Sequence, residues 1–178
     1  MTASNQKTVF VTVGTTKFDN LIRAVDSRTF AAALKHKGFT HLLVQKGNGT
    51  YSPSVLLGPG MSSGTTVDGL YVEFFDYASS LAQMILSSAL VISHAGSGSI
   101  FETLTVGVPL IVVPNPLLMD NHQQELGHQL EGMRHLVCAS PDGISEAVLN
   151  FDASVLQPFV KGSAAGIASR LDALMGFQ

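Results

Sequence analysis

The chain has 178 residues, of which 46% are hydrophobic and 13% charged, and its formal net charge is −3. This length suits one domain with a substantial core, no apolar run reaches the roughly 18 residues that a membrane span needs, and the lack of a Lys/Arg cluster argues against a nucleic-acid partner. Cys138 is the single cysteine, which excludes an internal disulfide and a multi-cysteine metal site and favours a reducing, cytosolic setting.

The predicted elements of the first half are strands and helices with one long interruption. Apolar β-branched runs predict strands, and apolar residues spaced by three to four predict helices. In chain order these are a strand at residues 8–14, a helix at 18–37, a strand at 41–45, a strand at 70–75 and a helix at 79–88. Residues 46–69 are rich in Gly, Ser, Thr and Pro, which predicts a long loop.

The second half continues the alternation of strands and helices. It predicts a strand at residues 89–93, a helix at 100–106, a strand at 110–114, a helix at 121–132, a strand at 135–139, a helix at 141–149 and a last helix at 163–175. This order predicts one α/β domain over residues 1–178, built on a doubly wound, mainly parallel, Rossmann-like sheet. In such sheets ligands bind at the carboxyl ends of the strands.

The segment SHAGSGSIFETL, residues 93–104, carries the sharpest functional signal. It leaves a buried strand, turns on glycines and enters a helix near Ser99. Glycines let a ligand approach the backbone closely, and a helix start offers free N–H groups and a positive dipole end. A diphosphate fits such a loop, and the residues expected to hold it are His94, Ala95, Gly96, Ser97, Gly98 and Ser99. The alternative is a glycine-rich turn without a ligand.

The same segment argues against other nucleotide sites. Phe101 stands where the dinucleotide fingerprint GxGxxG needs its third glycine, and no acidic residue ends the next strand, LIVVPNP. No GxxxxGK[ST] phosphate loop occurs. We therefore expect no nicotinamide or other cofactor. A DxD carboxylate pair is also missing and the six histidines show no close metal spacing, so no metal is required.

Polar residues for the rest of a nucleotide sugar follow the predicted strands. Glu102 lies one turn into the helix, where its carboxylate can accept hydrogen bonds from two ribose hydroxyls; a carboxylate that only stabilises the helix dipole is the alternative. A dense run of donors and acceptors, suited to a sugar or else to a helix cap, consists of Asn121, His122, Gln123 and Gln124.

Two more loops contribute candidate ligands. Gly14, Thr15 and Thr16 form a second small-residue turn, and the threonine hydroxyls could bond phosphate oxygens, unless the turn is a plain helix cap. Phe75 ends the third strand within EFFDYA and could flank a base. Core packing is the alternative for it or for Phe74.

Four segments together resemble one family of proteins. They are VTVGTTKFDNLI, VISHAGSGSIFETL, GVPLIVVPN and LMDNHQQEL, within residues 8–139. They are similar to the catalytic subunits of eukaryotic dolichol-pathway UDP-GlcNAc transferases and, more distantly, to the C-terminal half of the bacterial peptidoglycan glycosyltransferases that make lipid II. One departure is Gly127, which stands where the resemblance leads us to expect alanine.

The resemblance implies half of a GT-B fold and an inverting transfer from UDP-GlcNAc that adds the second GlcNAc to dolichyl-diphosphate-GlcNAc. It also implies a membrane-anchored partner subunit that recruits this lipid acceptor at the cytosolic face of the endoplasmic reticulum. Carried over by position, residues 94–99 and 15–16 hold the diphosphate, Glu102 the ribose and residues 121–124 the GlcNAc, while Phe75 lies near the uracil.

No general base is assigned. His94 and His122 are candidates, but both suit phosphate or sugar contacts better, and the base can lie on the partner. Two alternatives stay open: a self-sufficient UDP-sugar transferase with another acceptor, and a noncatalytic nucleotide-sugar-binding module. The last predicted helix has an apolar stripe, which either docks on the chain's own sheet or contacts the partner. The stripe consists of Ile167, Leu171, Leu174 and Met175.

Overall fold

The computed structural model describes residues 6–78, 80–116 and 121–160, without the side chains of residues 121–123. Its strands are β1 (Thr8–Thr12), β2 (His41–Gln45), β3 (Ser63–Thr65), β4 (Tyr71–Phe75), β5 (Leu90–His94), β6 (Leu110–Val113) and β7 (Val137–Cys138). Its helices are α1 (Asp19–Val25), α2 (Arg28–His36), α3 (Ala82–Leu86), α4 (Ser97–Thr105), α5 (Asn121–Gly132), α6 (Ile144–Asn150) and the short 3-10 helix η1 (Ala153–Val155).

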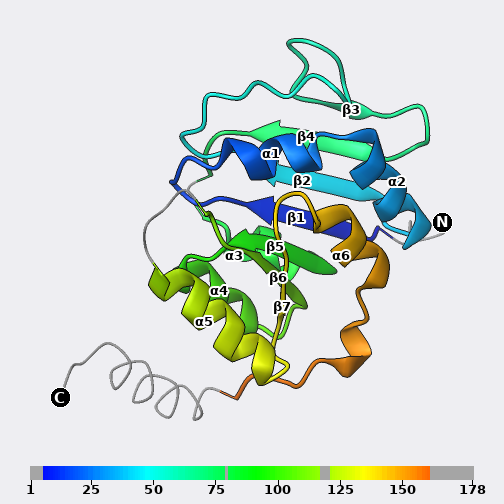
Figure 1. Cartoon of the computed structure of the whole chain (residues 1–178). Helices are drawn as coiled ribbons and strands as arrows, with labels where there is room; N and C mark the ends of the chain where they lie inside the picture. Colours follow the sequence, from blue (N-terminus) through cyan, green and yellow to red (C-terminus); the bar gives the residue numbers. More distant parts are fainter. Residues whose placement is uncertain (1–5, 79, 117–120, 161–178) are drawn as a thin grey trace.

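The strands form one sheet in the order β3-β4-β2-β1-β5-β6-β7 (Figure 1). Neighbouring strands pair parallel throughout, except that β3 pairs antiparallel with β4. From β1 the chain winds outward to β2 and β4 on one side, and then returns to build β5, β6 and β7 on the other. The predicted doubly wound, mainly parallel sheet is therefore confirmed.

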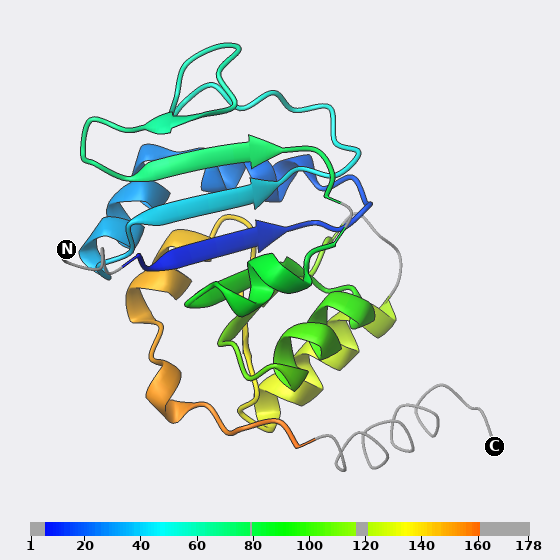
Figure 2. The same ribbon diagram turned by 180° about the vertical axis from the view of Figure 1, so that it is seen from behind.

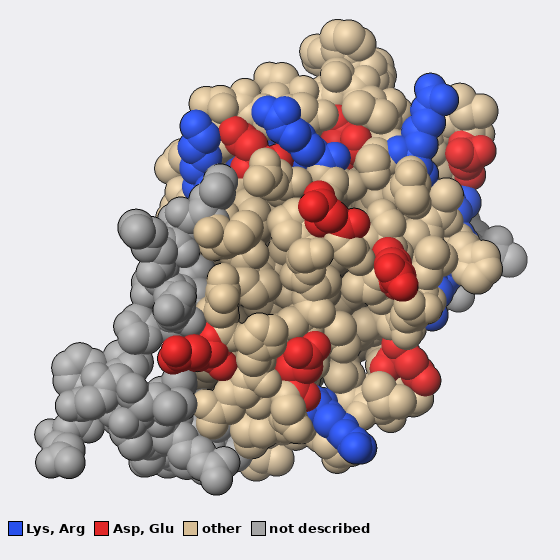
Figure 3. Space-filling model, in the orientation of Figure 1, with Lys and Arg blue, Asp and Glu red and all other residues tan. Residues whose placement is uncertain are grey.

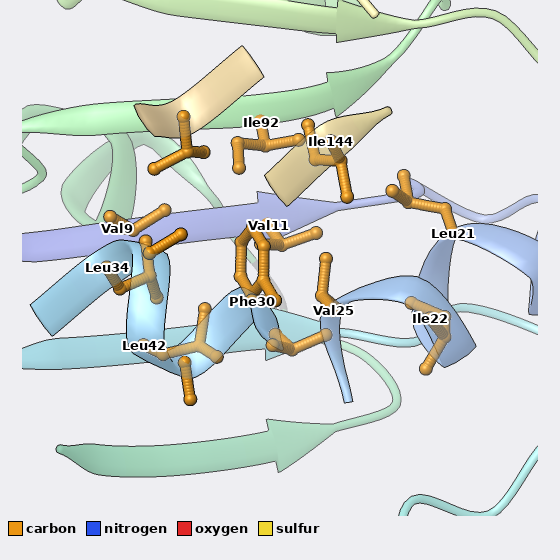
Figure 4. Packing of buried hydrophobic residues seen from close by; sticks show 14 of the residues in the cluster. Val9, Val11, Leu21, Ile22, Val25, Phe30, Leu34, Leu42, Ile92 and Ile144 are labelled. Atoms are coloured by element: carbon orange, nitrogen blue, oxygen red, sulfur yellow. The ribbon is translucent and has the colours of Figure 1, made fainter. Parts of the chain in front are cut away.

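Helices cover both faces of the sheet (Figures 1 and 2). Alternate residues of β1 point to opposite faces: Val9 and Val11 belong to a core cluster with residues of α1, α2 and α6, whereas Phe10 belongs to one with residues of α3, α4 and α5. Figure 4 shows side chains from β1, β2, β5 and three helices converging in the first cluster. Because both faces are buried, the strands are apolar without alternation.

The helix predicted at residues 18–37 is in fact two helices, α1 and α2. Asp26, which is 1% exposed, ends the first, and its carboxylate accepts hydrogen bonds from the three backbone N–H groups of residues 54–56 at 2.8–3.1 Å. Ser27 then caps α2 by accepting a hydrogen bond from the N–H of Phe30. The apolar periodicity continues through this break, which is why the sequence pattern did not reveal it.

The predicted loop at residues 46–69 is held in place by two aspartates and contains β3. Asp19 accepts hydrogen bonds from Thr50 and from the N–H of Tyr51, and the Tyr51 hydroxyl donates to Asp26 at 2.8 Å. Burial raises the pKa of Tyr51 to about 12, and the Asp26 carboxylate adds to this rise. The segment is therefore an ordered layer over the β4 side of the sheet (Figure 1).

Other predictions differ only at element ends. α5 has its predicted bounds, whereas α3 and β7 are shorter than predicted and α6 begins at Ile144 instead of residue 141. α4 begins at Ser97, three residues before the predicted start, because Gly96 already serves as its N-cap. The short helix η1 was not predicted. The helix predicted at residues 163–175, with its apolar stripe, lies outside the described residues.

The surface reflects the low charge of the chain. On the face drawn in Figure 3, Lys and Arg side chains stand in several separate places, acidic side chains lie among them, and wide areas are uncharged. Within the described ranges, no helix combines the length and the hydropathy that crossing a bilayer requires.

Asp26→Asn is expected to lower the free energy of unfolding by about 1.5–3 kcal/mol, because an amide nitrogen replaces one acceptor oxygen that faces N–H donors. Urea denaturation measures the change. Asp68→Asn is the matched control, since Asp68 is an exposed aspartate of the same segment. Equal losses in the two variants would contradict the anchoring role of Asp26.

Candidate functional site

The site lies where the sheet changes winding direction, between β1 and β5. Thr12 pairs with Ser93 near the carboxyl ends of these two strands, so the loops that follow them leave the sheet side by side. Open α/β sheets bind ligands in the crevice at such a switch point. The structure thereby brings the predicted phosphate turn at Gly14 next to the predicted diphosphate loop at His94.

His94 packs between two glycines, one from each loop. Its side chain is buried, with the residue 7% exposed. A Cβ atom on Gly14, which has φ of +59°, would lie 2.9 Å from Cε1 of His94, and one on Gly96 would collide with Nε2. Both glycines are therefore required by the imidazole ring, which joins the two loops.

The hydrogen bonding and the pKa of His94 are unusual. Its Nδ1 is buried and has no hydrogen-bond partner among the described residues. Burial lowers the pKa of His94 below its usual value, and the backbone of Thr12 acts in the opposite direction. The ring is therefore neutral at neutral pH. Unpaired buried polar atoms are uncommon in folded proteins and occur at functional sites.

The N-terminus of α4 follows the loop of His94 and has no side-chain cap. Gly96 is the N-cap, and the first backbone hydrogen bond of the helix joins the N–H of Ile100 to the carbonyl of Gly96. The earlier N–H groups, of residues 97–99, are those that a helix leaves without an internal partner. Free N–H groups at a helix start are of the kind that bind phosphate, and their role here stays a prediction. Ser97 and Gly98 are both exposed.

Glu102 is placed to serve a ligand bound at this helix start. It lies four residues after Gly98, so the two positions share one face of α4. The residue is exposed. Its carboxylate is therefore open to hydroxyl groups of a bound molecule, and a role at the ribose stays a prediction.

The turn after β1 uses its two threonines differently. The Thr16 hydroxyl donates to the carbonyl of Val13 at 2.8 Å, and the N–H of Thr16 donates to the same carbonyl. Thr15 is exposed, and its carbonyl accepts a hydrogen bond from the Asn48 side chain. Thr16 therefore shapes the turn, and Thr15 has the hydroxyl that is more open to a phosphate.

Two aromatic residues follow or end β4. Phe75 is half-buried and stacks on Phe10 with ring centroids 6.4 Å apart, so it contributes to the core, as Phe74 does on the other face. Tyr77, at 69% exposure, is the more open aromatic ring, and it was not singled out from the sequence. Either ring, that of Phe75 or that of Tyr77, can lie beside a uracil, because aromatic faces stack well on bases.

The predicted sugar-contacting run starts α5, as expected. The side chains of Asn121, His122 and Gln123 lie outside the described residues, so the candidate base His122 is not placed. Gln124 is half-buried and lines a cavity of about 330 Å³ with residues that follow β6 and β7.

The cavity beside Gln124 also contains a group that the sequence did not indicate. His128, Glu131 and Cys138 bring a ring nitrogen, a carboxylate oxygen and a sulfur within 4.8 Å of one another. Burial raises the pKa of the Cys138 thiol to about 12, and Glu131 adds to the rise. In the sequence, the group is indicated only by the spacing of three residues between His128 and Glu131 on one helix. Such a spacing is common and does not by itself point to a site.

Comparison with known proteins identifies the family. Residues 8–174 match the glycosyltransferase family 28 C-terminal domain. The chain belongs to this family. It is 44% identical over 130 residues to the Homo sapiens "UDP-N-acetylglucosamine transferase subunit ALG13", a match covering 73% of this chain and 11% of the human protein. The chain thus corresponds to about a tenth of that relative, and the family resemblance drawn from the sequence is confirmed.

Two solved structures share the fold of this family 28 domain. The NMR solution structure of ALG13 is 27% identical, with a TM-score of 0.70, and the match covers 93% of this chain and 95% of that one. The crystal structure of MurG from Acinetobacter baumannii is 17% identical, with a TM-score of 0.60, and the match covers 86% of this chain and 44% of MurG. The expected equivalence to one half of a GT-B glycosyltransferase is confirmed.

Gly98→Val is expected to abolish UDP protection against heat while leaving the fold intact. A Cβ atom at Gly98 meets nothing within 4 Å, so the fold tolerates the side chain, which would fill the space beside the free N–H groups. Gly132→Val, a helical glycine with equally open surroundings, is the control. If UDP raises the Tm of Gly98→Val as much as that of the wild type, the loop binds no diphosphate.

His94 is expected to make the protein less stable below about pH 6.5, the ordinary pKa of histidine. Because the folded pKa is lowered, the unfolded chain binds more protons, and the free energy of unfolding falls as the pH falls through 6.5. Urea denaturation at pH 7.5 and pH 5.5 measures this loss. Between pH 7.5 and pH 5.5, His94→Gln should lose less of its free energy of unfolding than the wild type does. The control His36→Gln, at an exposed site, should lose as much as the wild type. An unchanged pH dependence in His94→Gln would contradict the assignment.

Proposed function

We propose that the chain is the donor-binding subunit of a UDP-GlcNAc transferase and that it works with a partner which supplies the acceptor half. The observation that carries the proposal is the junction at the ends of β1 and β5, where the His94 ring packs against Gly14 and Gly96 and brings the uncapped start of α4 next to the turn at Gly14. Membership in a glycosyltransferase family supports a sugar-nucleotide diphosphate as the anion that binds here, and the name of the human relative supports UDP-GlcNAc as the donor.

In this proposal the loops at the carboxyl ends of the strands bind the donor. The N–H groups of residues 97–99 and the turn at Thr15 receive the diphosphate, and Glu102 receives the ribose hydroxyls on the same face of α4. Phe75 or Tyr77 lies by the uracil, and residues 121–124 meet the GlcNAc. When the acceptor hydroxyl attacks the anomeric carbon, negative charge grows on the departing UDP, and the positive end of α4 stabilises it.

The general base is not His94 in this proposal. Its ring is buried between Gly14 and Gly96, so a proton taken from an acceptor has no open path to it. A candidate base must come within about 2.6–3.2 Å of the acceptor hydroxyl. His122 and a group on the partner are the two remaining sources, and the acceptor then approaches from the partner's side.

We infer further that the reaction adds the second GlcNAc to dolichyl-diphosphate-GlcNAc at the cytosolic face of the endoplasmic reticulum, through a membrane-anchored partner. Three findings support this. The four sequence segments resemble dolichol-pathway enzymes, the human relative is named a subunit, and the aligned part of MurG is less than half of that protein. A full GT-B enzyme has two halves, and in this proposal the acceptor half is contributed by the partner.

The decisive experiment measures radiolabelled transfer from UDP-GlcNAc to dolichyl-diphosphate-GlcNAc by the purified chain alone, by membranes carrying a co-purifying partner, and by both together. Activity only in the combined sample supports the proposal. Activity of the chain alone would make it a self-sufficient transferase. UDP-GlcNAc binding without transfer in any sample would leave a noncatalytic module.

Glu102→Gln is expected to weaken binding of both UDP-GlcNAc and UDP about ten- to a hundredfold, because hydrogen bonds to a charged acceptor contribute about 1.5–3 kcal/mol. Calorimetric titration measures both affinities. Glu146→Gln, an exposed glutamate on α6, should bind both ligands as the wild type does. Unchanged affinity in Glu102→Gln would remove this residue from the ribose site.

EDTA is expected to cause no loss of transfer by the complete enzyme that Mg²⁺ or Mn²⁺ specifically restores. The start of α4 supplies the field that neutralises the diphosphate, so a bridging metal ion is not needed there. Initial rates with and without the chelator test this. Loss of activity that returns only with Mg²⁺ or Mn²⁺ would contradict it.

A further inference from the structure

Three side chains with metal-binding groups converge on one cavity, away from the proposed diphosphate site. His128 and Glu131 lie one helical turn apart on α5, and Cys138 ends β7. Their ligand atoms lie within 4.8 Å of one another, and Nδ1 of His128 is 3.6 Å from Oε2 of Glu131. A nitrogen, a carboxylate oxygen and a sulfur are the three atom types by which proteins bind Zn²⁺.

The Glu131 carboxylate is held in position by the backbone. Oε1 of Glu131 accepts a hydrogen bond from the N–H of Cys138 at 2.7 Å, which fixes the carboxylate. This hydrogen bond involves only Oε1, and Oε2 faces the imidazole of His128. A carboxylate with one oxygen tied to the backbone and one directed at other ligand atoms is oriented as metal ligands usually are.

Gly127 leaves room around the sulfur. A Cβ atom at this position would lie 3.1 Å from Sγ of Cys138, closer than side chains normally approach. This is the position where the family resemblance led us to expect alanine. The glycine therefore gives Cys138 free space on the side that faces α5.

We propose that His128, Glu131 and Cys138 bind a thiophilic divalent metal ion of the Zn²⁺ class, with the fourth coordination position open to the cavity beside Gln124. Zinc bond lengths of about 2.0–2.3 Å place tetrahedral ligand atoms about 3.3–3.6 Å apart. The present spacing of up to 4.8 Å needs a contraction of about 1 Å, and the His128 side chain, at 66% exposure, is free to make it. Binding replaces the thiol proton, which is released to the solvent.

The metal site is distinct from the diphosphate site but close to the sugar-binding helix. In the sheet β6 separates β7 from β5, so β7 lies about 10 Å from the strand that leads into the diphosphate loop. Gln124 precedes His128 by one turn of α5 and lines the same cavity. A bound ion would therefore fasten α5 to β7 and hold the helix that begins with the predicted sugar contacts.

Cobalt titration tests the site, because Co²⁺ can replace Zn²⁺ and absorbs in the near ultraviolet when a thiolate binds it. The full chain, without a histidine tag and under a phosphine reductant, is titrated with Co²⁺ and then with Zn²⁺. Cys138 is the only cysteine in the sequence, so any such band reports this sulfur. We expect the band at one ion per chain, its loss on adding Zn²⁺, and a rise of the Tm with Zn²⁺.

Variants separate the three-ligand site from a lone thiol. Cys138→Ser should lose the band, and His128→Gln and Glu131→Gln should each weaken Co²⁺ binding about tenfold or more. Glutamine at 131 keeps an oxygen for the Cys138 N–H, so the fold is retained. Gly127→Ala should weaken binding by crowding the sulfur, and His36→Gln, an exposed histidine on α2, should bind as the wild type does. No band, one ion per two chains, or a band insensitive to both His128→Gln and Glu131→Gln would overturn the proposal.

Discussion

The packing of the His94 imidazole between Gly14 and Gly96 is the contact on which the site depends. β1 and β5 are adjacent in the sheet, but adjacency alone does not fix the loops that follow them. The ring fills the gap between these loops, and each glycine is needed because a Cβ atom would strike it. The uncapped start of α4 is thereby fixed against the turn after β1. An anion site formed from backbone groups needs such support, since its donors cannot adjust individually.

A second constraint acts on the far side of the sheet, at Asp26. A buried carboxylate is costly unless its oxygens are paired, and here backbone and hydroxyl donors from residues 51–56 pair them. Asp26 also separates α1 from α2. One residue therefore determines both the break between these helices and the course of the long connection between β2 and β4. Asp19 repeats the arrangement with Thr50. The connection between β2 and β4 is thus held by polar contacts in addition to the apolar packing of these strands.

Sequence patterns predicted those parts of the molecule that are set by local periodicity. The parallel strands are apolar runs, α5 is amphipathic, and the glycines of HAGSGS mark the turn into α4, so the fold and the position of this turn could be predicted directly, whereas its role at a diphosphate stays a prediction. What failed depends on contacts between distant residues. The helix break at Asp26 requires donors about 30 positions away, β3 is short and polar and gains its strand form only from β4, and Cys138 meets His128 only once β7 packs on α5. Tyr77 went unremarked because exposure cannot be read from the composition of a strand end.

The two edges of the sheet have a consequence for assembly. β3 has three residues and β7 has two, so in the described part of the chain each edge offers very few free backbone groups. Sheets that associate by adding a strand need a long, regular edge, and short or irregular edges prevent it. Under the proposed function, the partner subunit would therefore dock through side chains on helices and loops, which would permit a hinge between the two halves of the enzyme. A junction of that kind could open to release UDP without breaking backbone hydrogen bonds between strands.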